Sequence, residues 1–205
     1  TGSGNRPSLS LAVFNSSYSD LQVVQIGPLS QILANAAEAT IQGFEGEASF
    51  RPMKELTVSA NFSYLDASFD RFSTTDPRRG FAAFDLKGKT LPMVSDFTGG
   101  VRLQWRKALA SGAVVMASGA ASWRSDFYFT EFNTPDALQK GYGKLDIGVS
   151  WTSPNGAMTL SAYGRNLTDE TTLSSMSVVS PLLGSLRVAS YDPPRHFGVT
   201  IARSF

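Results

Sequence analysis

The last ten residues of the chain alternate strictly between two kinds of side chain. From His196 to Phe205, odd positions carry Phe, Val, Ile, Arg and Phe, and even positions carry His, Gly, Thr, Ala and Ser. Successive side chains of a strand point to opposite faces, so this segment is predicted to be a strand with a mainly apolar face and a polar or small face. Terminal residues usually fray. A terminal strand that stops on Phe therefore indicates a terminus built into a sheet, as is typical of outer-membrane barrels.

Composition excludes several classes of protein. The sequence has 18 Lys and Arg against 17 Asp and Glu. Nucleic-acid-binding domains usually carry a basic excess, so no nucleic-acid partner is expected. With no Cys and one His, thiolate and His-rich metal sites are excluded, and no cofactor is predicted. The longest uncharged apolar stretch, residues 109–122, is shorter than the ~20 residues of a spanning helix. No signal peptide is recognised, so the sequence is expected to be a mature chain or a piece of one.

The same alternation recurs along the chain and predicts eight strands. They are expected at residues 9–24, 37–50, 56–69, 94–106, 113–129, 142–151, 158–167 and 196–205. The connections alternate in length: 51–55, 107–112 and 152–157 are short, whereas 25–36, 70–93, 130–141 and 168–195 are long. Short periplasmic turns opposite long extracellular loops are typical of outer-membrane barrels. A soluble sandwich or lipocalin-like barrel has no reason to segregate loop length so regularly.

Large aromatic residues end several of these strands. Phe50, Trp105, Trp151 and Phe205 each close a strand that follows a long connection. We expect them at the periplasmic rim, because amphipathic rings prefer the membrane interface. Arg203 falls on the lipid-facing side and is expected to reach headgroups or water. The first strand is ambiguous, since two registers compete: Leu9, Leu11 and Val13 against Ala12, Phe14 and Tyr18.

Alternation also assigns charged side chains to the polar face, which lines the lumen of a barrel. The residues expected to face the lumen or a substrate are Arg102, Arg124, Tyr128, Lys144, Asp146 and Arg165, with Glu45 and Glu47 beside them. Most are expected to hydrate the lumen or to pair with one another, and one or two to contact cargo. Phe127 and Phe129 share a face with Trp123 and are predicted to form an interfacial aromatic girdle.

Several motifs resemble those of the TonB-dependent outer-membrane receptors. Residues 163–170, YGRNLTDE, resemble the penultimate-strand motif of that family, and residues 193–198, PPRHFG, resemble its final-strand motif. Residues 43–47, 63–67 and 88–92 also fit the family's usual run of sequence. The family often has an aromatic or apolar residue where this chain has Arg203. The residues that match the motifs are Arg165, Asn166, Leu167, Asp169, Pro194, Arg195, Gly198 and Phe205.

The resemblance implies a fold and a function. The fold is all-β: an antiparallel transmembrane β-barrel of about 22 strands with a plug in its lumen. Residues 1–205 are expected to supply about eight C-terminal strands, while the plug domain, the TonB-contacting segment and the N-terminal strands are not in this sequence. The implied function is TonB-energised uptake of a scarce nutrient of the siderophore, cobalamin or glycan class. The implied location is the bacterial outer membrane, with the C-terminus in the periplasm. Expected partners are outer-membrane lipid, the remaining strands and plug, the TonB complex, and a small-molecule or glycan substrate.

Two other functions remain open at this stage. One is a self-contained eight-stranded barrel with a structural or adhesive role, since eight strands suffice for a barrel. It requires pairing between the strands at 9–24 and 196–205, whereas the resemblance predicts that these two do not pair. The other is a membrane hydrolase that uses His196. No nucleophile motif accompanies that residue, so the chain is not expected to be an enzyme.

Overall fold

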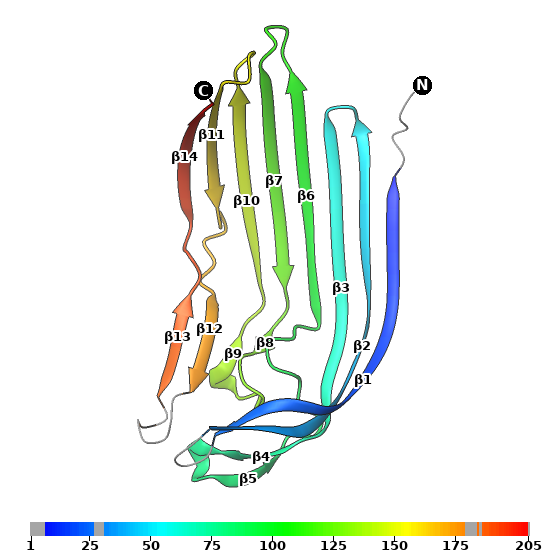
Figure 1. Ribbon diagram of the computed structural model, residues 1–205, viewed down its shortest axis with the longest axis vertical. Helices are drawn as coiled ribbons and strands as arrows, with labels where there is room; N and C mark the ends of the chain where they lie inside the picture. The colour runs from blue at the N-terminus through cyan, green and yellow to red at the C-terminus, as the bar shows by residue number, and fades with distance from the viewer. Residues whose placement is uncertain (1–6, 27–30, 179–183, 185, 205) are drawn as a thin grey trace.

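Eight long strands form one antiparallel sheet. The structure, a computed structural model, describes residues 7–26, 31–178, 184 and 186–204. The strand order is β1-β2-β3-β6-β7-β10-β11-β14, so each long strand lies beside the next one in the sequence (Figure 1). The eight predicted strands are confirmed, with these bounds: β1 Ser8–Ile26, β2 Gln31–Met53, β3 Leu56–Arg71, β6 Phe97–Ala108, β7 Val114–Arg124, β10 Tyr142–Thr152, β11 Met158–Arg165 and β14 His196–Arg203.

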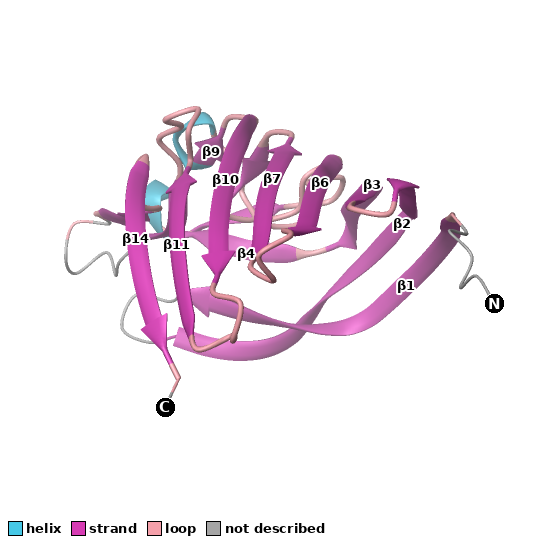
Figure 2. Cartoon of the chain, turned by 90° about the horizontal axis from the view of Figure 1, so that it is seen from above, coloured by secondary structure: helices cyan, strands magenta, loops and turns pink. Residues whose placement is uncertain are grey.

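The sheet is curved and open. Seen from above, the strands form an arc whose two ends are β1 and β14 (Figure 2). Within the described residues, β1 pairs with β2 and β14 pairs with β11, and the two edge strands do not pair with each other. The prediction about these edges is therefore confirmed. A closed eight-stranded barrel needs that missing ladder, so the arrangement is that of part of a larger barrel wall.

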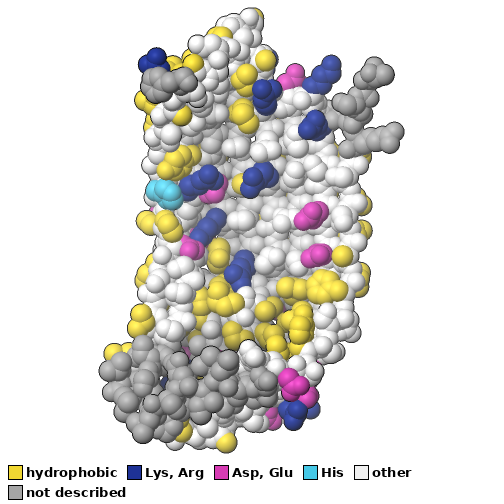
Figure 3. Space-filling view, viewed as in Figure 1, with side chains coloured by type: hydrophobic (Ala, Val, Ile, Leu, Met, Phe, Trp, Pro, Cys, Tyr) yellow, Lys and Arg dark blue, Asp and Glu magenta, His cyan; other side chains and the backbone are white. Residues whose placement is uncertain are grey.

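The two faces of the sheet differ in chemistry. Leu11, Phe44, Ile147 and Val199 lie on the convex face, where they are 46–75% exposed. Such a large exposed apolar surface marks contact with lipid or another apolar partner. Figure 3 shows the opposite, concave face, on which charged side chains of both signs gather along the middle of the wall. The ambiguity in the first strand is resolved, because Leu11 lies opposite Gly46 and Val13 lies opposite Phe44 on the apolar face.

The rim aromatics that the structure describes lie on the apolar face near the short turns. Trp105 pairs with Leu56, Phe50 with Val58, and Trp151 with Leu160. Arg203 is on the same face, opposite Met158. Phe205 lies outside the described residues.

The long connections gather at the other end of the sheet, where they form small structures of their own (Figure 1). No described helix is long and apolar enough to cross a membrane. The elements in these connections are β4 Ser73–Asp76, η1 Pro77–Arg79, β5 Ala82–Asp85, β8 Phe127–Tyr128, η2 Pro135–Ala137, β9 Leu138–Gln139, β12 Leu173–Val178 and β13 Arg187–Tyr191.

The predicted long connection at residues 25–36 is wrong. β1 continues to Ile26 and β2 begins at Gln31, so most of that segment belongs to the two strands. The ladder shifts register between Tyr18 and Gln22, where Asp20 adopts a φ of 57°. A bulge interrupts the alternation of faces without ending the pairing, so the pattern in the sequence stops before the strands do.

The predicted strand at 113–129 is too long, and the girdle assigned to its end is wrong. β7 ends at Arg124. The next residue, Ser125, accepts a hydrogen bond at its Oγ from the backbone N–H of Phe97. Phe127 and Phe129 are only 2% and 8% exposed, with their rings 5.1 Å apart. They pack inside a loop instead of facing lipid, because the alternation of faces does not carry across the break after Arg124.

Candidate functional site on the concave face

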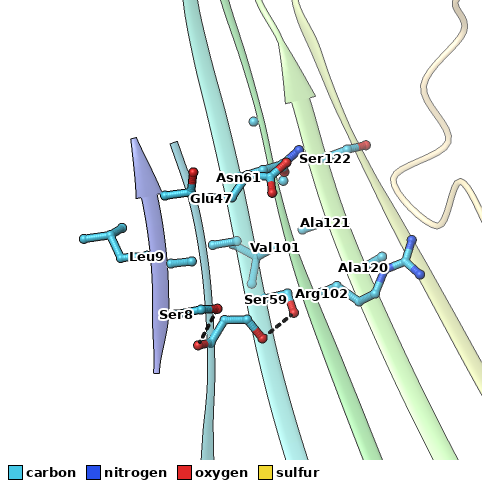
Figure 4. A pocket seen from close by; sticks show the side chains of 16 residues that line it. Ser8, Leu9, Glu47, Ser59, Asn61, Val101, Arg102, Ala120, Ala121 and Ser122 are labelled. Carbon is cyan, nitrogen blue, oxygen red and sulfur yellow. Dashed lines mark hydrogen bonds between the residues drawn. The ribbon is translucent and has the colours of Figure 1, made fainter. Parts of the chain in front are cut away.

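A groove lined by polar and apolar residues crosses five neighbouring strands on the concave face. Its volume is about 570 Å³, within the usual range of ligand sites, although it is open on one side. Gly100 and Ala120 form part of its floor, and their small size leaves room above the sheet. The groove spans β1 to β7 (Figure 4). Its polar lining consists of Ser8, Ser10, Glu47, Ser49, Ser59, Asn61, Arg102 and Ser122.

Three charged side chains of the concave face lack partners within the sheet, and two of them, Glu47 and Arg102, line this groove. Glu45, Glu47 and Arg102 are exposed, and none of them makes a hydrogen bond or ion pair in the described part of the chain. Glu47 lies opposite Asn61, and Arg102 opposite Ala120. Their charges are therefore available to groups from outside this wall.

Lys144 lies on the same face but is already paired. Its Nζ donates to Asp192 Oδ2 at 2.8 Å and to Thr172 Oγ1 at 2.7 Å. The hydrogen bonds from Lys144 and Thr172 lower the pKa of the Asp192 carboxyl below its usual value. Thr172 precedes β12 and Asp192 follows β13, so the hydrogen bonds of Lys144 attach the β12–β13 hairpin to the wall.

Asp146 and Arg165 form a second pair between β10 and β11. Arg165 Nη1 donates to Asp146 Oδ2 at 2.9 Å, and the backbone N–H of Asn166 donates to Asp146 Oδ1, also at 2.9 Å. The Arg165 guanidinium also lies 5.7 Å from the centre of the Tyr163 ring. Asp146 therefore holds the end of β11 in place, and both of its oxygens are occupied.

The family motifs form a hydrogen-bond network where the chain leaves β11 and where it enters β14. Asn166 is 4% exposed with a φ of 50°, and its side chain exchanges hydrogen bonds with the backbone of Glu170 at 2.9 and 3.0 Å. Asn166 Nδ2 also reaches the carbonyl of Pro193 at 3.4 Å. Asp169 Oδ2 accepts from Arg195 Nη2 at 2.9 Å. These residues join the two ends of a long connection, so their contacts are structural.

Three further motif residues make contacts in the same region. Leu167 donates its backbone N–H to the carbonyl of Leu145 at 2.8 Å. Pro194 offers its carbonyl to His196 Nδ1 at 2.9 Å. Gly198 lies beneath the Tyr163 ring, so close that a Cβ on Gly198 would lie 2.3 Å from Tyr163 Cζ.

Arg124 and Tyr128 are drawn into the loops. Arg124 Nε donates to Ser95 Oγ at 2.6 Å, its Nη2 donates to the carbonyl of Met93, and its guanidinium lies 3.7 Å from the centre of the Phe127 ring. The carbonyl of Tyr128 accepts the Met93 N–H at 2.7 Å. The structure thus separates these two residues from the groove around Arg102.

A charged cluster centred on Arg78 was missed by the sequence analysis. Asp76 is 2% exposed and accepts from Arg78 Nε at 3.0 Å, while Arg78 Nη1 reaches Thr134 Oγ1 at 3.2 Å. Burial alone raises the pKa of Asp76, but the hydrogen bonds from Arg78 outweigh it and the pKa is lowered. Asp76 also caps η1 by accepting the Arg78 N–H. The Asp-Pro-Arg-Arg run is a turn signal that points to this cap.

Comparison with known proteins identifies the family. The family model described as "TonB dependent receptor-like, beta-barrel" matches residues 2–167. The chain belongs to this family, and its curved sheet is part of the barrel wall. No curated protein matches the chain.

Solved structures with the same fold include receptors from three bacteria. The ferric yersiniabactin uptake receptor FyuA of Yersinia pestis superposes with a TM-score of 0.77 at 22% identity, covering 97% of this chain and 28% of that one. For the siderophore receptor PiuA of Acinetobacter baumannii, the TM-score is 0.71 at 19% identity, and the match covers 96% of this chain and 26% of PiuA. For the ferripyoverdine receptor of Pseudomonas aeruginosa, the TM-score is 0.64 at 16% identity, and the match covers 98% of this chain and 25% of that receptor. The chain thus spans about a quarter of the length of these receptors.

Proposed function

We propose that this chain is part of the wall of an outer-membrane receptor that takes up a ferric siderophore in a TonB-energised step. The observation that supports the proposal is the concave face itself: a wall of this family with a groove and with unpaired charges on the face that would line the lumen. Capture, movement of a plug and release on the periplasmic side involve no covalent chemistry, and the proposed protein is a transporter, not an enzyme.

The narrowing to siderophores rests on the structural relatives. FyuA, PiuA and the ferripyoverdine receptor are named for siderophores or their ferric complexes. Cobalamin and glycans are the competing cargo classes, and the uptake test below distinguishes them from siderophores. We further propose that the short turns, and with them the C-terminus, lie on the periplasmic side, since long loops of such barrels are extracellular.

The unpaired charges of the concave face have a proposed role as well. Glu45, Glu47 and Arg102 meet polar groups of the plug or of cargo that passes between plug and wall. Arg102 is the clearest candidate for anionic groups, because a guanidinium presents several donors to a carboxylate or phenolate. Lys144, Asp146 and Arg165 instead hold the wall together through their own pairs.

The test uses the intact receptor in the bacterium that carries it. Deleting the gene is expected to abolish uptake of radiolabelled iron from one class of purified ferric siderophore, with cobalamin and an oligosaccharide panel as controls. Deleting TonB is expected to give the same loss. Unchanged siderophore uptake in the deletion strain, or loss confined to cobalamin or a glycan, would contradict the siderophore assignment.

A single substitution then tests the groove. Arg102→Ala is expected to weaken cargo uptake about tenfold, the usual cost of one lost hydrogen bond to a charged group. Lys54→Ala, in the short turn between β2 and β3, is the matched loss of one cation away from the groove. Equal uptake by both variants, at equal amounts in the membrane, would remove Arg102 from the proposed site.

A further inference from the structure

The hairpin of β12 and β13 continues the last two strands of the wall. β11 ends at Arg165, and the chain enters β12 at Leu173. On the way back, β13 ends at Tyr191, and the chain enters β14 at His196. β12 pairs with β13, and β11 pairs with β14. In Figure 1 the two pairs lie end to end, with β13 in line with β14. β13 therefore extends the edge of the wall beyond a break of four residues, 192–195.

Hydrogen bonds keep the two pairs aligned across this break. Pro193 and Pro194 have no backbone N–H to donate, so the regular ladder is interrupted there. The N–H of Asp192 still donates to the carbonyl of Thr172 at 2.9 Å, which closes the base of the hairpin. Asn166 Nδ2 reaches the carbonyl of Pro193 at 3.4 Å and joins that base to the end of β11. The hairpin is thus held as a continuation of the wall.

The edge strand of the wall is short. β14 has eight residues, whereas β1, at the other edge, has 19. A tilted strand needs about 9–11 residues to cross the hydrocarbon core of a membrane. The strand that closes the barrel against β14 therefore finds little backbone to pair with in β14 itself. β13 adds five residues, Arg187–Tyr191, along the same edge.

The outer edge of β13 is open. Within the described residues, β13 pairs with β12 alone. The side-chain contacts of the hairpin lead to elements that precede β11, because Lys144 of β10 bonds to Asp192 and Arg187 pairs with Asp136 of η2. Val188 and Tyr191 are 54% and 67% exposed. An open edge with exposed apolar side chains is a ready template for another strand.

We propose that the strand which closes the barrel against β14 is longer than β14, and that its outer part pairs with the open edge of β13. The partner is a segment of the same receptor, because the wall already requires a neighbour at β14 and β13 continues that edge. The chain covers 28% of the length of FyuA, so a receptor of similar length has ample chain to supply this strand. The inference concerns how the wall closes and does not depend on the cargo.

Residue-resolved hydrogen exchange tests the pairing in the intact receptor, in lipid and at neutral pH. Successive N–H groups of an antiparallel strand point to opposite edges. If β13 is paired on one edge only, every second N–H from Arg187 to Tyr191 faces water and exchanges near its intrinsic rate. We expect both alternating sets to exchange at least about tenfold more slowly than that rate. Near-intrinsic exchange of one set would overturn the proposal.

Photochemical cross-linking identifies the partner. A benzoylphenylalanine at Val199 of β14 is expected to cross-link to the closing strand and to mark its place in the receptor sequence. The same group at Tyr191 of β13 is expected to cross-link to the same strand, nearer to its extracellular end. Leu109, an exposed apolar residue next to a short turn, is the control position and should not give this product. Cross-links from Tyr191 only to lipid, to a second receptor or to another part of the chain would contradict the proposal.

Two neighbouring proline variants provide a matched pair. Val188 and Ala189 are successive residues of β13, so one N–H points to β12 and the other to the open edge. Proline is tolerated where an edge N–H has no partner and is disruptive where the N–H is bonded. Val188→Pro and Ala189→Pro are therefore both expected to reduce the Tyr191 cross-link at least about tenfold, with the Val199 cross-link unchanged. A wild-type yield from either variant would show that β13 is paired on one side only.

Discussion

At the scale of single residues, the charges of the concave face divide into two groups. Lys144 and Asp146 are held by partners at 2.8 and 2.9 Å, whereas Arg102 and Glu47 have none among the described residues. A paired charge contributes to the stability of the wall, and removing one partner leaves the other without its hydrogen bonds. An unpaired charge in water contributes little to stability, so its substitution should affect binding instead.

The first prediction concerns Asp146. Asp146→Ala removes the acceptor of both Arg165 and the Asn166 N–H and is expected to destabilise the intact receptor by about 1–2 kcal/mol, a value reduced by the partial exposure of the pair. Arg102→Ala is expected to change stability by less than about 0.5 kcal/mol. Urea unfolding in lipid vesicles measures both. Equal unfolding midpoints for the two variants would refute this division.

The second prediction concerns Gly198 and Tyr163. A Cβ at Gly198 would lie 2.3 Å from Tyr163 Cζ, so the ring must move. The Tyr163 side chain is 37% exposed, so the ring has room to move. Gly198→Ala is therefore expected to cost about 1 kcal/mol, at the low end of overpacking. In a double-mutant cycle with Tyr163→Ala, the two effects should not add. Strict additivity would show that the ring does not cause the cost.

At the scale of elements, small hairpins are attached to the wall by a few polar contacts. β12 and β13 pair with each other, and Lys144 joins their base to β10 through Asp192 and Thr172. Arg187 of β13 also pairs with Asp136 of η2. Hairpins held in this way are expected to open locally at a lower free energy than the long strands.

The third prediction follows from the pKa of Asp192. Its folded-state pKa is lowered, so the Lys144 pair stabilises the hairpin above the unfolded-state value of about 4. That stabilisation is lost as the pH falls through the lowered folded-state pKa. Hydrogen exchange of β12 and β13, corrected for intrinsic rates, should therefore accelerate on acidification relative to β10. Asp192→Asn should remove this dependence, while Asp136→Asn controls for the second attachment. An unchanged pH dependence in Asp192→Asn would disprove the role of the pair.

At the scale of the whole molecule, the wall has two open edges. β1 and β14 each pair on one side only within the described residues. Hydrocarbon offers no partner for an unpaired backbone group, and each such group costs several kcal/mol there. In a membrane, both edges therefore require neighbouring strands.

The fourth prediction is that residues 1–205 alone do not fold as a closed monomer. Leu11→Cys with Ile201→Cys tests pairing of the two edges, and Leu160→Cys with Ile201→Cys is the control, because Leu160 and Ile201 are opposite each other in the ladder. After refolding in detergent, only the control pair should form a disulfide within one chain. An efficient edge-to-edge disulfide in a monodisperse monomer would favour the small barrel.

The sequence by itself determined the eight strands, the two faces and the family, because alternation of side chains and short motifs are local properties. It did not predict that β1 reaches Ile26 or that β2 begins as early as Gln31, since a bulge shifts the face of every following residue. Tertiary structure alone decided that Phe127 is buried in a loop, that Arg78 joins two connections, and that Arg102 is unpaired while Lys144 is not. The physical reason is that burial and pairing depend on contacts between residues far apart in the chain, and periodicity within one strand carries no information about them.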